Sequence, residues 1–121
     1  MGNFYEDLKM NTTTECVITP LSHRRCVASL PKATTVEISE WLKLLPDWKI
    51  ETGELSRNFD FKNYYQTMAF VNALAWISHG EDHHPDLLVK YNACVVRYST
   101  HSVGGLSEND FICAAKADGL I

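Results

Sequence analysis

The stretch from His79 to Pro85 concentrates side chains that can do chemistry. It reads His-Gly-Glu-Asp-His-His-Pro and so holds three imidazoles and two carboxylates. An unperturbed imidazole titrates at about pH 6.5, so a group of histidines suits proton transfer near neutral pH or metal binding. Pro85 prevents a helix from continuing through the stretch. The stretch is a candidate site, although an acidic, histidine-rich turn can equally be a solvated helix end.

Length and composition restrict the class of protein. A chain of 121 residues with 45% hydrophobic side chains and a net charge of -4 predicts one ordinary globular domain. No basic stripe or arginine cluster indicates direct binding to nucleic acid. The longest apolar run is too short for a membrane span, and the N-terminus does not resemble a signal peptide, so we expect a cytoplasmic protein. The cysteines show no CxxC pairing, which fits reduced thiols, and they are Cys16, Cys26, Cys94 and Cys113.

Residues 1–33 show no lasting apolar period. We expect them to form an irregular or partly disordered tail, and we expect that removing residues 1 to about 30 leaves folding and turnover nearly unchanged. Cys16, His23 and Cys26 do not have the spacing of a recognised zinc pattern, so this segment predicts no metal site.

The rest of the chain, residues 34–121, predicts a single domain in which helical and strand patterns alternate. Helical spacing of apolar residues runs from Thr34 to Pro46 and again from Lys62 to Ser78, and Ser107 caps a last helix to about Ala117. The order α-β-β-α-β-β-α predicts an α+β fold, a four-stranded antiparallel sheet with three helices on one face. The predicted strands span residues 47–51, 54–61, 87–91 and 93–99.

The predicted helix over residues 62–78 has an apolar face too wide to pack on one sheet. One line of apolar side chains can face the sheet, and the adjacent line then needs cover. Closed symmetric oligomers are the commonest way to cover such a face, so we expect self-association. The two lines consist of Tyr64, Met68, Val71 and Ala75, and of Phe70, Leu74 and Ile77.

The predicted topology brings a further histidine to the candidate site. The turn with His83 and His84 precedes the last hairpin, and the loop of residues 100–106, which holds His101, follows its final strand. In a hairpin of this length both segments can lie at the same end of the sheet. We therefore expect His101 to join the cluster.

The spacing of these residues resembles the signature of the pterin-4a-carbinolamine dehydratases. The resemblance covers about residues 35–118. One departure is His79, because the family often has glutamate at this first position. The matching order is His79, three residues, His83-His84-Pro85, five residues, Tyr91, nine residues, His101, eight residues and Asp110. The flanking segments Ser99-Thr100-His101 and Gly105-Leu106-Ser107 also match the family's sequence at these places.

The resemblance implies a lyase that removes water from 4a-hydroxytetrahydropterin and gives quinonoid dihydropterin, in recycling after aromatic amino acid hydroxylation. It implies no metal or other cofactor, a homodimer or homotetramer, and a functional link to an aromatic amino acid hydroxylase. Within the implied catalytic set, His83 and His101 act as the acid/base pair and His84 positions the substrate. The implied substrate-binding residues are His79, Asp82, His83, His84, Pro85, Thr100, His101, Ser102, Val103 and Asp110.

Other readings of the same residues stay open. Asp82 and Asp110 can orient an imidazole or the pterin, or they can be helix-end carboxylates. His79 and His83 lie four apart with Glu81 between them, which is conceivable for a metal-dependent hydrolase, but the glutamate is not where the HExxH arrangement has it. A third reading is a non-catalytic binding partner or regulator, as animal members of the family are for a transcription factor, or a molybdopterin-related role.

Whether the side chain at position 79 can act on His83 depends on whether the helix continues through Gly80. If the helix continues through Gly80, His79 and His83 share one helical face, and the charge at position 79 acts on the imidazole of His83. If Gly80 ends the helix, position 79 points to solvent and tolerates any residue.

Overall fold

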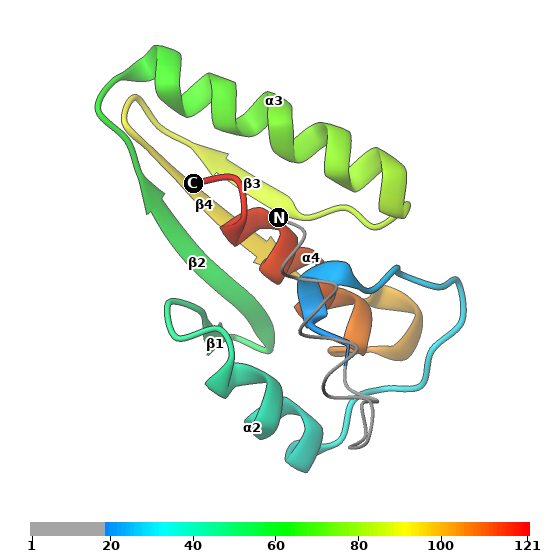
Figure 1. Ribbon diagram of the computed structural model, residues 1–121. Coiled ribbons are helices and arrows are strands. Elements are labelled where there is room, and N and C mark those ends of the chain that lie inside the picture. Colours follow the sequence, from blue (N-terminus) through cyan, green and yellow to red (C-terminus); the bar gives the residue numbers. More distant parts are fainter. Residues whose placement is uncertain (1–18) are drawn as a thin grey trace, which may run out of the picture.

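The computed structural model describes residues 19–121 (Figure 1). Four antiparallel strands form one sheet in the order β1-β2-β4-β3. The predicted α+β class and the predicted order of helices and strands are confirmed, with two short 3-10 turns, η1 and η2, added. The elements are η1 (Leu21–His23), α2 (Thr35–Lys43), β1 (Lys49–Glu51), β2 (Glu54–Asp60), α3 (Tyr64–Glu81), β3 (Asp86–Val89), β4 (Ala93–Tyr98), η2 (His101–Val103) and α4 (Glu108–Asp118).

Local sequence signals explain several of these boundaries. Thr34 begins α2 with a capping box, because its Oγ1 accepts from Glu37 N at 3.1 Å and the Glu37 carboxylate accepts from Thr34 N at 2.9 Å. The hairpin of β1 and β2 turns at Thr52 and Gly53, which both have positive φ, as a two-residue turn of type I′ requires. These short-range signals set the start of α2 and the register of β1 against β2.

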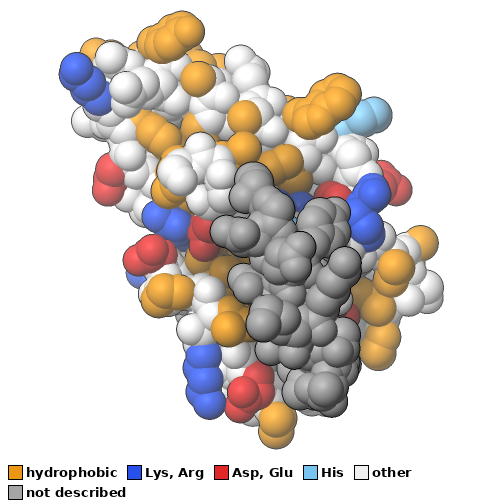
Figure 2. Space-filling view, in the orientation of Figure 1, with side chains coloured by type: hydrophobic (Ala, Val, Ile, Leu, Met, Phe, Trp, Pro, Cys, Tyr) orange, Lys and Arg blue, Asp and Glu red, His pale blue; other side chains and the backbone are white. Residues whose placement is uncertain are grey.

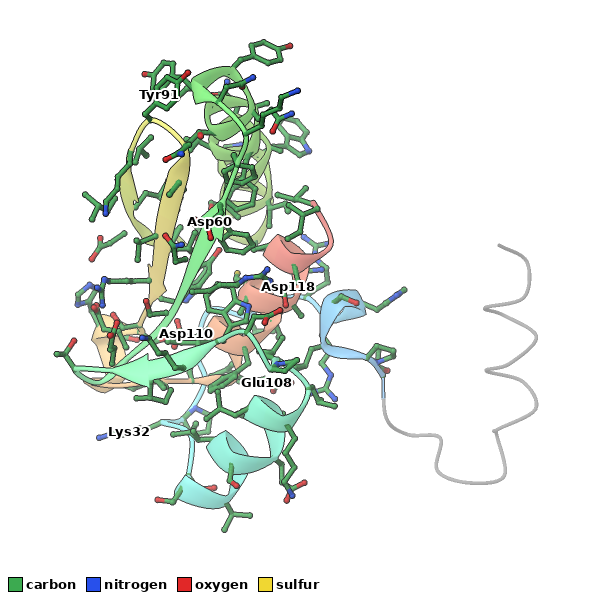
Figure 3. The ribbon with its side chains drawn as sticks, turned by 90° about the vertical axis from the view of Figure 1, so that its left-hand side faces the viewer. Lys32, Asp60, Tyr91, Glu108, Asp110 and Asp118 are labelled. Atoms are coloured by element: carbon green, nitrogen blue, oxygen red, sulfur yellow. The ribbon has the colours of Figure 1, made fainter. Side chains whose placement is uncertain are left out.

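The helices cover one face of the sheet (Figures 1 and 3). On α3 the buried apolar side chains are Phe70 and Leu74, whereas Tyr64 and Ala75 of the adjacent line are exposed. The line that contains Phe70 and Leu74 therefore faces the sheet, and the prediction that one of the two lines does so is confirmed. The core shared by the sheet, α3 and α4 includes Leu55, Phe59, Cys94, Val96, Tyr98, Phe70, Leu74, Phe111, Ile112, Cys113, Ala114 and Ala117.

Residues 19–33 are irregular apart from η1, as predicted, but they pack closely against α4. Leu21 is only 4% exposed and belongs to the core. Arg24 pairs with Glu108 at 2.6 Å, and Ala33 N donates to Leu106 O at 2.7 Å. This part of the predicted tail thus has a fixed place in the fold, and the rest of that tail, residues 1–18, lies outside the described residues.

Helix α3 extends three residues further than the sequence pattern indicated, to Glu81 instead of Ser78. Gly80 lies within the helix, and Asp82 ends it with a left-handed backbone (φ 53°). The turn that carries the histidines therefore begins at Asp82, and His79 belongs to the helix. Within the described residues, no helix combines the length and apolar character that crossing a lipid bilayer requires.

Candidate active site

A pocket of about 360 Å³ lies where the end of α3, the end of β4 and η2 meet. The side chains of His83, His84 and His101 line it together, so the structure brings the two histidine-bearing stretches to one place. His84 and His101 are exposed, whereas His83 is half-buried. The other lining residues are Val27, Ala28, Asp82, Ser99, Thr100, Ser102 and Asn109.

The imidazole of His83 is held by a buried carboxylate. Its Nε2 lies 2.6 Å from Oδ1 of Asp110, and the side chains of His83 and Asp110 are 12% and 0% exposed. An ionised carboxylate can only accept hydrogen bonds, so a charged Asp110 places the ring proton on Nε2. The other ring nitrogen, Nδ1, is then the unprotonated one.

The second oxygen of Asp110 joins two further segments. Thr100 Oγ1 donates to Oδ2 at 2.7 Å, and Ser107 N donates to Oδ2 at 2.9 Å. The hydroxyls of Thr100 and Ser107 also lie 2.8 Å apart. Asp110, labelled in Figure 3, therefore fastens the first turn of α4 to the loop after β4 and to His83. Asp110 thus makes the contacts of both interpretations left open by the sequence. It binds the imidazole of His83, and it accepts from the backbone at the start of α4.

Tyr98 lies beside the imidazole of His83. The rings of Tyr98 and His83 are nearly parallel, with an interplanar angle of 9° and 6.0 Å between their centroids. Burial raises the pKa of Tyr98, and the nearby Cys113, Cys26 and Asp110 raise it further, so the phenol stays neutral beside the imidazole. Tyr98 could not be recognised from the sequence as part of the site, because an inward-facing tyrosine of a strand has the same pattern as ordinary core.

The loop after β4 presents its side chains through a short closed turn. Thr100 and Gly105 face each other as an isolated bridge, with Thr100 N donating to Gly105 O at 2.8 Å. Gly104 ends η2 in the left-handed conformation (φ 65°), which glycine adopts without strain. This turn places His101 and Ser102 on the pocket wall.

The pocket does not collect every predicted binding residue. Asp82, His83, His84, Thr100, His101 and Ser102 line it, and Asp110 lies behind His83. His79, Pro85 and Val103 are not among its lining residues. His79 is an exposed residue of α3 whose ring lies 6.4 Å from that of Trp76. The condition that α3 continues through Gly80 is met, but Asp82 turns the chain away before His83, so the two histidines are not on one helical face.

One wall of the pocket comes from the N-terminal segment, which the sequence analysis did not connect with the site. Val27 and Ala28 line the pocket beside the histidines. The side-chain amide of Asn109 holds this wall, because its Oδ1 accepts from Val27 N at 3.2 Å and its Nδ2 donates to Val27 O at 2.8 Å. No periodic signal in residues 19–33 could have indicated this contact, which joins residues 82 positions apart.

The arrangement at the end of α3 differs from that of a metal site. Among residues 19–121, no three His, Cys, Asp or Glu side chains are grouped so that they could hold a metal ion. Glu81 instead pairs with Arg25 at 3.0 Å and with Lys116 at 3.7 Å. Burial acts to raise the pKa of Glu81, but the Cys26 backbone N–H and these two cations outweigh it, so the pKa is lowered.

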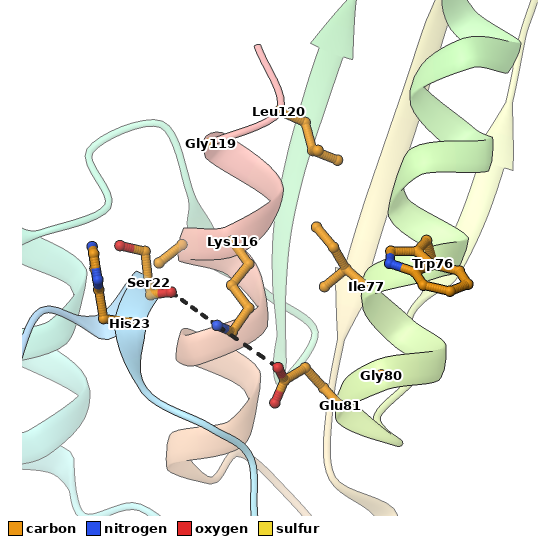
Figure 4. A pocket seen from close by; sticks show the side chains of 10 residues that line it. Ser22, His23, Trp76, Ile77, Gly80, Glu81, Lys116, Gly119 and Leu120 are labelled. Atoms are coloured by element: carbon orange, nitrogen blue, oxygen red, sulfur yellow. Dashed lines mark hydrogen bonds and ion pairs between the residues drawn. The ribbon is translucent and has the colours of Figure 1, made fainter. Parts of the chain in front are cut away.

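A second hollow, of about 470 Å³, lies between η1, α3 and α4 (Figure 4). Lys116 crosses it, with Nζ donating to Ser22 O at 2.8 Å and pairing with Glu81. Because this ammonium is already engaged and the imidazole cluster lies elsewhere, the histidine pocket is the candidate active site.

Comparisons with known proteins agree on one family. A family model described as "Pterin 4 alpha carbinolamine dehydratase" matches residues 31–120. A relative from Nitrosomonas eutropha, named "Putative pterin-4-alpha-carbinolamine dehydratase", is 53% identical over 110 residues, which are 90% of this chain and 97% of the relative. A relative of the same name from Stenotrophomonas maltophilia is 58% identical over 106 residues, with 84% of this chain and 91% of the relative covered.

Solved structures show the same fold. A protein from Brucella melitensis described as a transcriptional coactivator/pterin dehydratase aligns with a TM-score of 0.71 and 30% identity, over 74% of this chain and 97% of its own. A pterin dehydratase-like protein described as a RuBisCO assembly factor in the alpha-carboxysome aligns with a TM-score of 0.51 and 27% identity, over 60% of this chain and 84% of its own.

Proposed function

The chain belongs to the pterin 4 alpha carbinolamine dehydratase family, whose members are lyases, and we propose that it removes water from 4a-hydroxytetrahydropterin to give quinonoid dihydropterin. The observation that carries this proposal is the pocket lined by three imidazoles, one of which is held by the buried carboxylate of Asp110. A pocket of this size suits a small, flat ligand. The proposal includes a role in recycling the pterin after an aromatic amino acid hydroxylase.

The reaction needs two proton transfers, which two imidazoles can provide. A general acid protonates the 4a hydroxyl, so that the carbon–oxygen bond breaks and water leaves. A general base takes the proton from the adjacent ring nitrogen, whose electron pair then forms the carbon–nitrogen double bond. We assign these steps to His83 and His101, because both line the pocket and imidazole can donate and accept protons near neutral pH.

Asp110 contributes by orienting His83. The hydrogen bond to Nε2 fixes the tautomer and the direction of the ring, so that Nδ1 is the nitrogen that meets the substrate. The ring of Tyr98 lies nearly parallel to it, with 6.0 Å between the centroids. An imidazole that is already oriented loses little conformational freedom when the substrate arrives, which favours the reaction.

The remaining pocket side chains suit the rim of a pterin, which carries amide, amino and ring-nitrogen groups. His84 and the hydroxyl of Ser102 offer hydrogen-bond partners, and Asp82 offers a carboxylate for an amino group. The hydroxyl of Thr100 donates to Asp110, so it offers the substrate only an acceptor. We assign binding and positioning of the substrate to these residues.

Self-association through α3 is the second part of the proposal. Tyr65 and Trp76 on this helix are 81% and 77% exposed, and hydrophobic side chains stand out on the surface over α3 (Figure 2). A second copy of the chain would cover this face, since closed symmetric assemblies cover such patches most commonly.

A non-catalytic role in binding a protein is the alternative function. It is favoured by the descriptions of the two solved relatives as a coactivator and as an assembly factor. A partner-binding protein needs its exposed surface but not its proton-transferring side chains. Activity measurements therefore distinguish the two functions.

The direct test is the dehydration of 4a-hydroxytetrahydropterin, followed by absorbance. The uncatalysed reaction is itself appreciable and is subtracted. We expect a rate above this background that is proportional to protein concentration and unchanged by a metal chelator. A rate equal to the background, or loss of activity when a stoichiometric metal is removed, would contradict the proposed function.

A further inference from the structure

Two thiols that are far apart in the sequence meet behind the wall of the pocket. The Sγ atoms of Cys26 and Cys113 lie 3.5 Å apart, although the residues are separated by 87 positions. Cys26 belongs to the N-terminal segment and Cys113 to α4. Either thiol can donate a hydrogen bond to the other.

The two thiols differ in their access to solvent. Cys113 is 0% exposed, whereas Cys26 is half-buried. The hydrogen bond with Cys26 and burial both raise the pKa of Cys113, and the negative charges of Glu81 and Asp110 act in the same direction. A small oxidant from solvent therefore meets Cys26 first, and Cys113 stays behind it as a neutral thiol.

The backbone on the Cys26 side is held in place at this contact. Cys26 N donates to Glu81 Oε1 at 2.8 Å, and the next residue, Val27, is bonded in both directions by the side chain of Asn109. Asn109 precedes Cys113 by one turn of α4. A disulfide needs a sulfur–sulfur distance of about 2.05 Å, so the remaining gap can be closed by side-chain rotation while these bonds keep the two segments together.

We propose that Cys26 and Cys113 are an oxidation site, at which a peroxide forms an intramolecular disulfide. The Cys26 sulfur attacks one oxygen of the peroxide, the oxygen–oxygen bond breaks, and the leaving hydroxide takes up the Cys26 proton as water. The resulting sulfenic acid is attacked by the Cys113 sulfur, and the second hydroxide leaves as water with the Cys113 proton. Two thiols lose two electrons in total, and hydrogen peroxide is reduced to two molecules of water.

The disulfide would fasten one wall of the pocket to α4. Val27 and Ala28, which directly follow Cys26, line the pocket. The new bond closes a long loop, which restricts the unfolded chain, so the oxidised protein is expected to melt at a higher temperature. It also prevents the segment at Cys26 from opening away from α4, so the amide of Val27 exchanges with solvent more slowly.

The test treats the full chain with hydrogen peroxide, blocks the remaining thiols with an alkylating reagent, and maps peptides by mass spectrometry without reduction. We expect a peptide pair that joins Cys26 to Cys113, a melting temperature raised by several degrees, and at least tenfold slower hydrogen exchange at Val27, all reversed by dithiothreitol. Cys94, which is fully buried and has no thiol partner in residues 19–121, serves as the internal control that stays reduced.

The matched variant is Cys26→Ser, which keeps a small polar side chain at a half-buried position. It should give neither the linked peptide nor the shift in melting temperature. The inference is wrong if Cys26 or Cys113 links instead to Cys16 or to another molecule, or if both thiols are recovered unlinked after unfolding of the peroxide-treated protein.

Discussion

The Nε2 atom of His83 lies 2.6 Å from Oδ1 of Asp110, and this contact joins the turn after α3 to the first turn of α4. The same carboxylate accepts from the backbone of Ser107, the residue that caps α4. One side chain therefore both begins a helix and orients an imidazole of the candidate site. We therefore expect Asp110 to contribute to both stability and activity.

Replacing Asp110 should reduce both the dehydration rate and the stability of the fold. Asp110→Asn retains one accepting oxygen but places an amide where a second acceptor is needed, so we expect a 10- to 100-fold loss of dehydration rate, a scale usual for the loss of such an orienting group. Asp110→Ala should also lower the free energy of unfolding by about 1–3 kcal/mol, because it leaves buried donors without partners. Steady-state rates and urea unfolding measure the two effects.

The matched control for Asp110 is Glu108→Gln, in the same turn of α4. Glu108 pairs with Arg24 and does not line the histidine pocket, so this variant should retain its dehydration rate. Full activity of Asp110→Asn would show that the orientation of His83 by this carboxylate is unimportant.

The change His79→Glu should leave the site nearly unaffected. His79 is exposed on α3, and the left-handed Asp82 separates it from His83. We expect the dehydration rate to stay within about twofold of wild type and the imidazole NMR shifts of His83 to stay unchanged at fixed pH. A moved His83 resonance would show that the two side chains meet in solution, as the sequence analysis first considered.

Two deletions of the N-terminal segment should have different effects on the melting temperature. Deleting residues 1–18 is expected to leave the melting temperature nearly unchanged, in keeping with the composition of that stretch. Deleting residues 1–30 also removes buried Leu21 and the Arg24–Glu108 pair, and should lower the melting temperature by roughly 5 °C or more. Thermal unfolding of both deletions provides the comparison. Equal melting temperatures would mean that residues 19–30 are dispensable, as the sequence alone suggested.

Self-association through α3 should depend on its exposed aromatic side chains. At micromolar concentration we expect sedimentation at a multiple of the 13.7 kDa chain mass. Trp76→Glu places a charge on this face and should shift the protein to the monomer, whereas Val36→Glu, at an exposed position of α2, should not. A wild-type protein that sediments as a monomer would exclude this interface.

Short-range signals in the sequence predicted most of the fold. The capping box at Thr34, the turn at Thr52-Gly53 and the apolar line of Phe70 and Leu74 act over a few residues, and each has its counterpart in the structure. The extension of α3 past Gly80 was left open by the sequence, because a helical glycine costs about 1 kcal/mol locally. In the structure, Arg25 from a distant segment contacts Gly80 O and Glu81 at this end of the helix.

The histidines of the candidate site could be predicted from the sequence, but the residues that pack around them could not. His83, His84 and His101 were found from residue type and spacing, and the sheet topology explains their meeting. Tyr98 has the alternating pattern of any inward-facing strand residue, and the Val27 wall depends on long-range packing that leaves no periodic trace in the sequence.

The measurement that tests the central claim most directly is the background-corrected dehydration rate of His83→Ala and of His101→Ala beside the wild type. Loss of a general acid or base reduces rates by at least about 10²-fold. We expect a loss of this size in each variant, with the folded state verified by circular dichroism. Wild-type rates in either folded variant would contradict the assignment of the reaction to these two histidines.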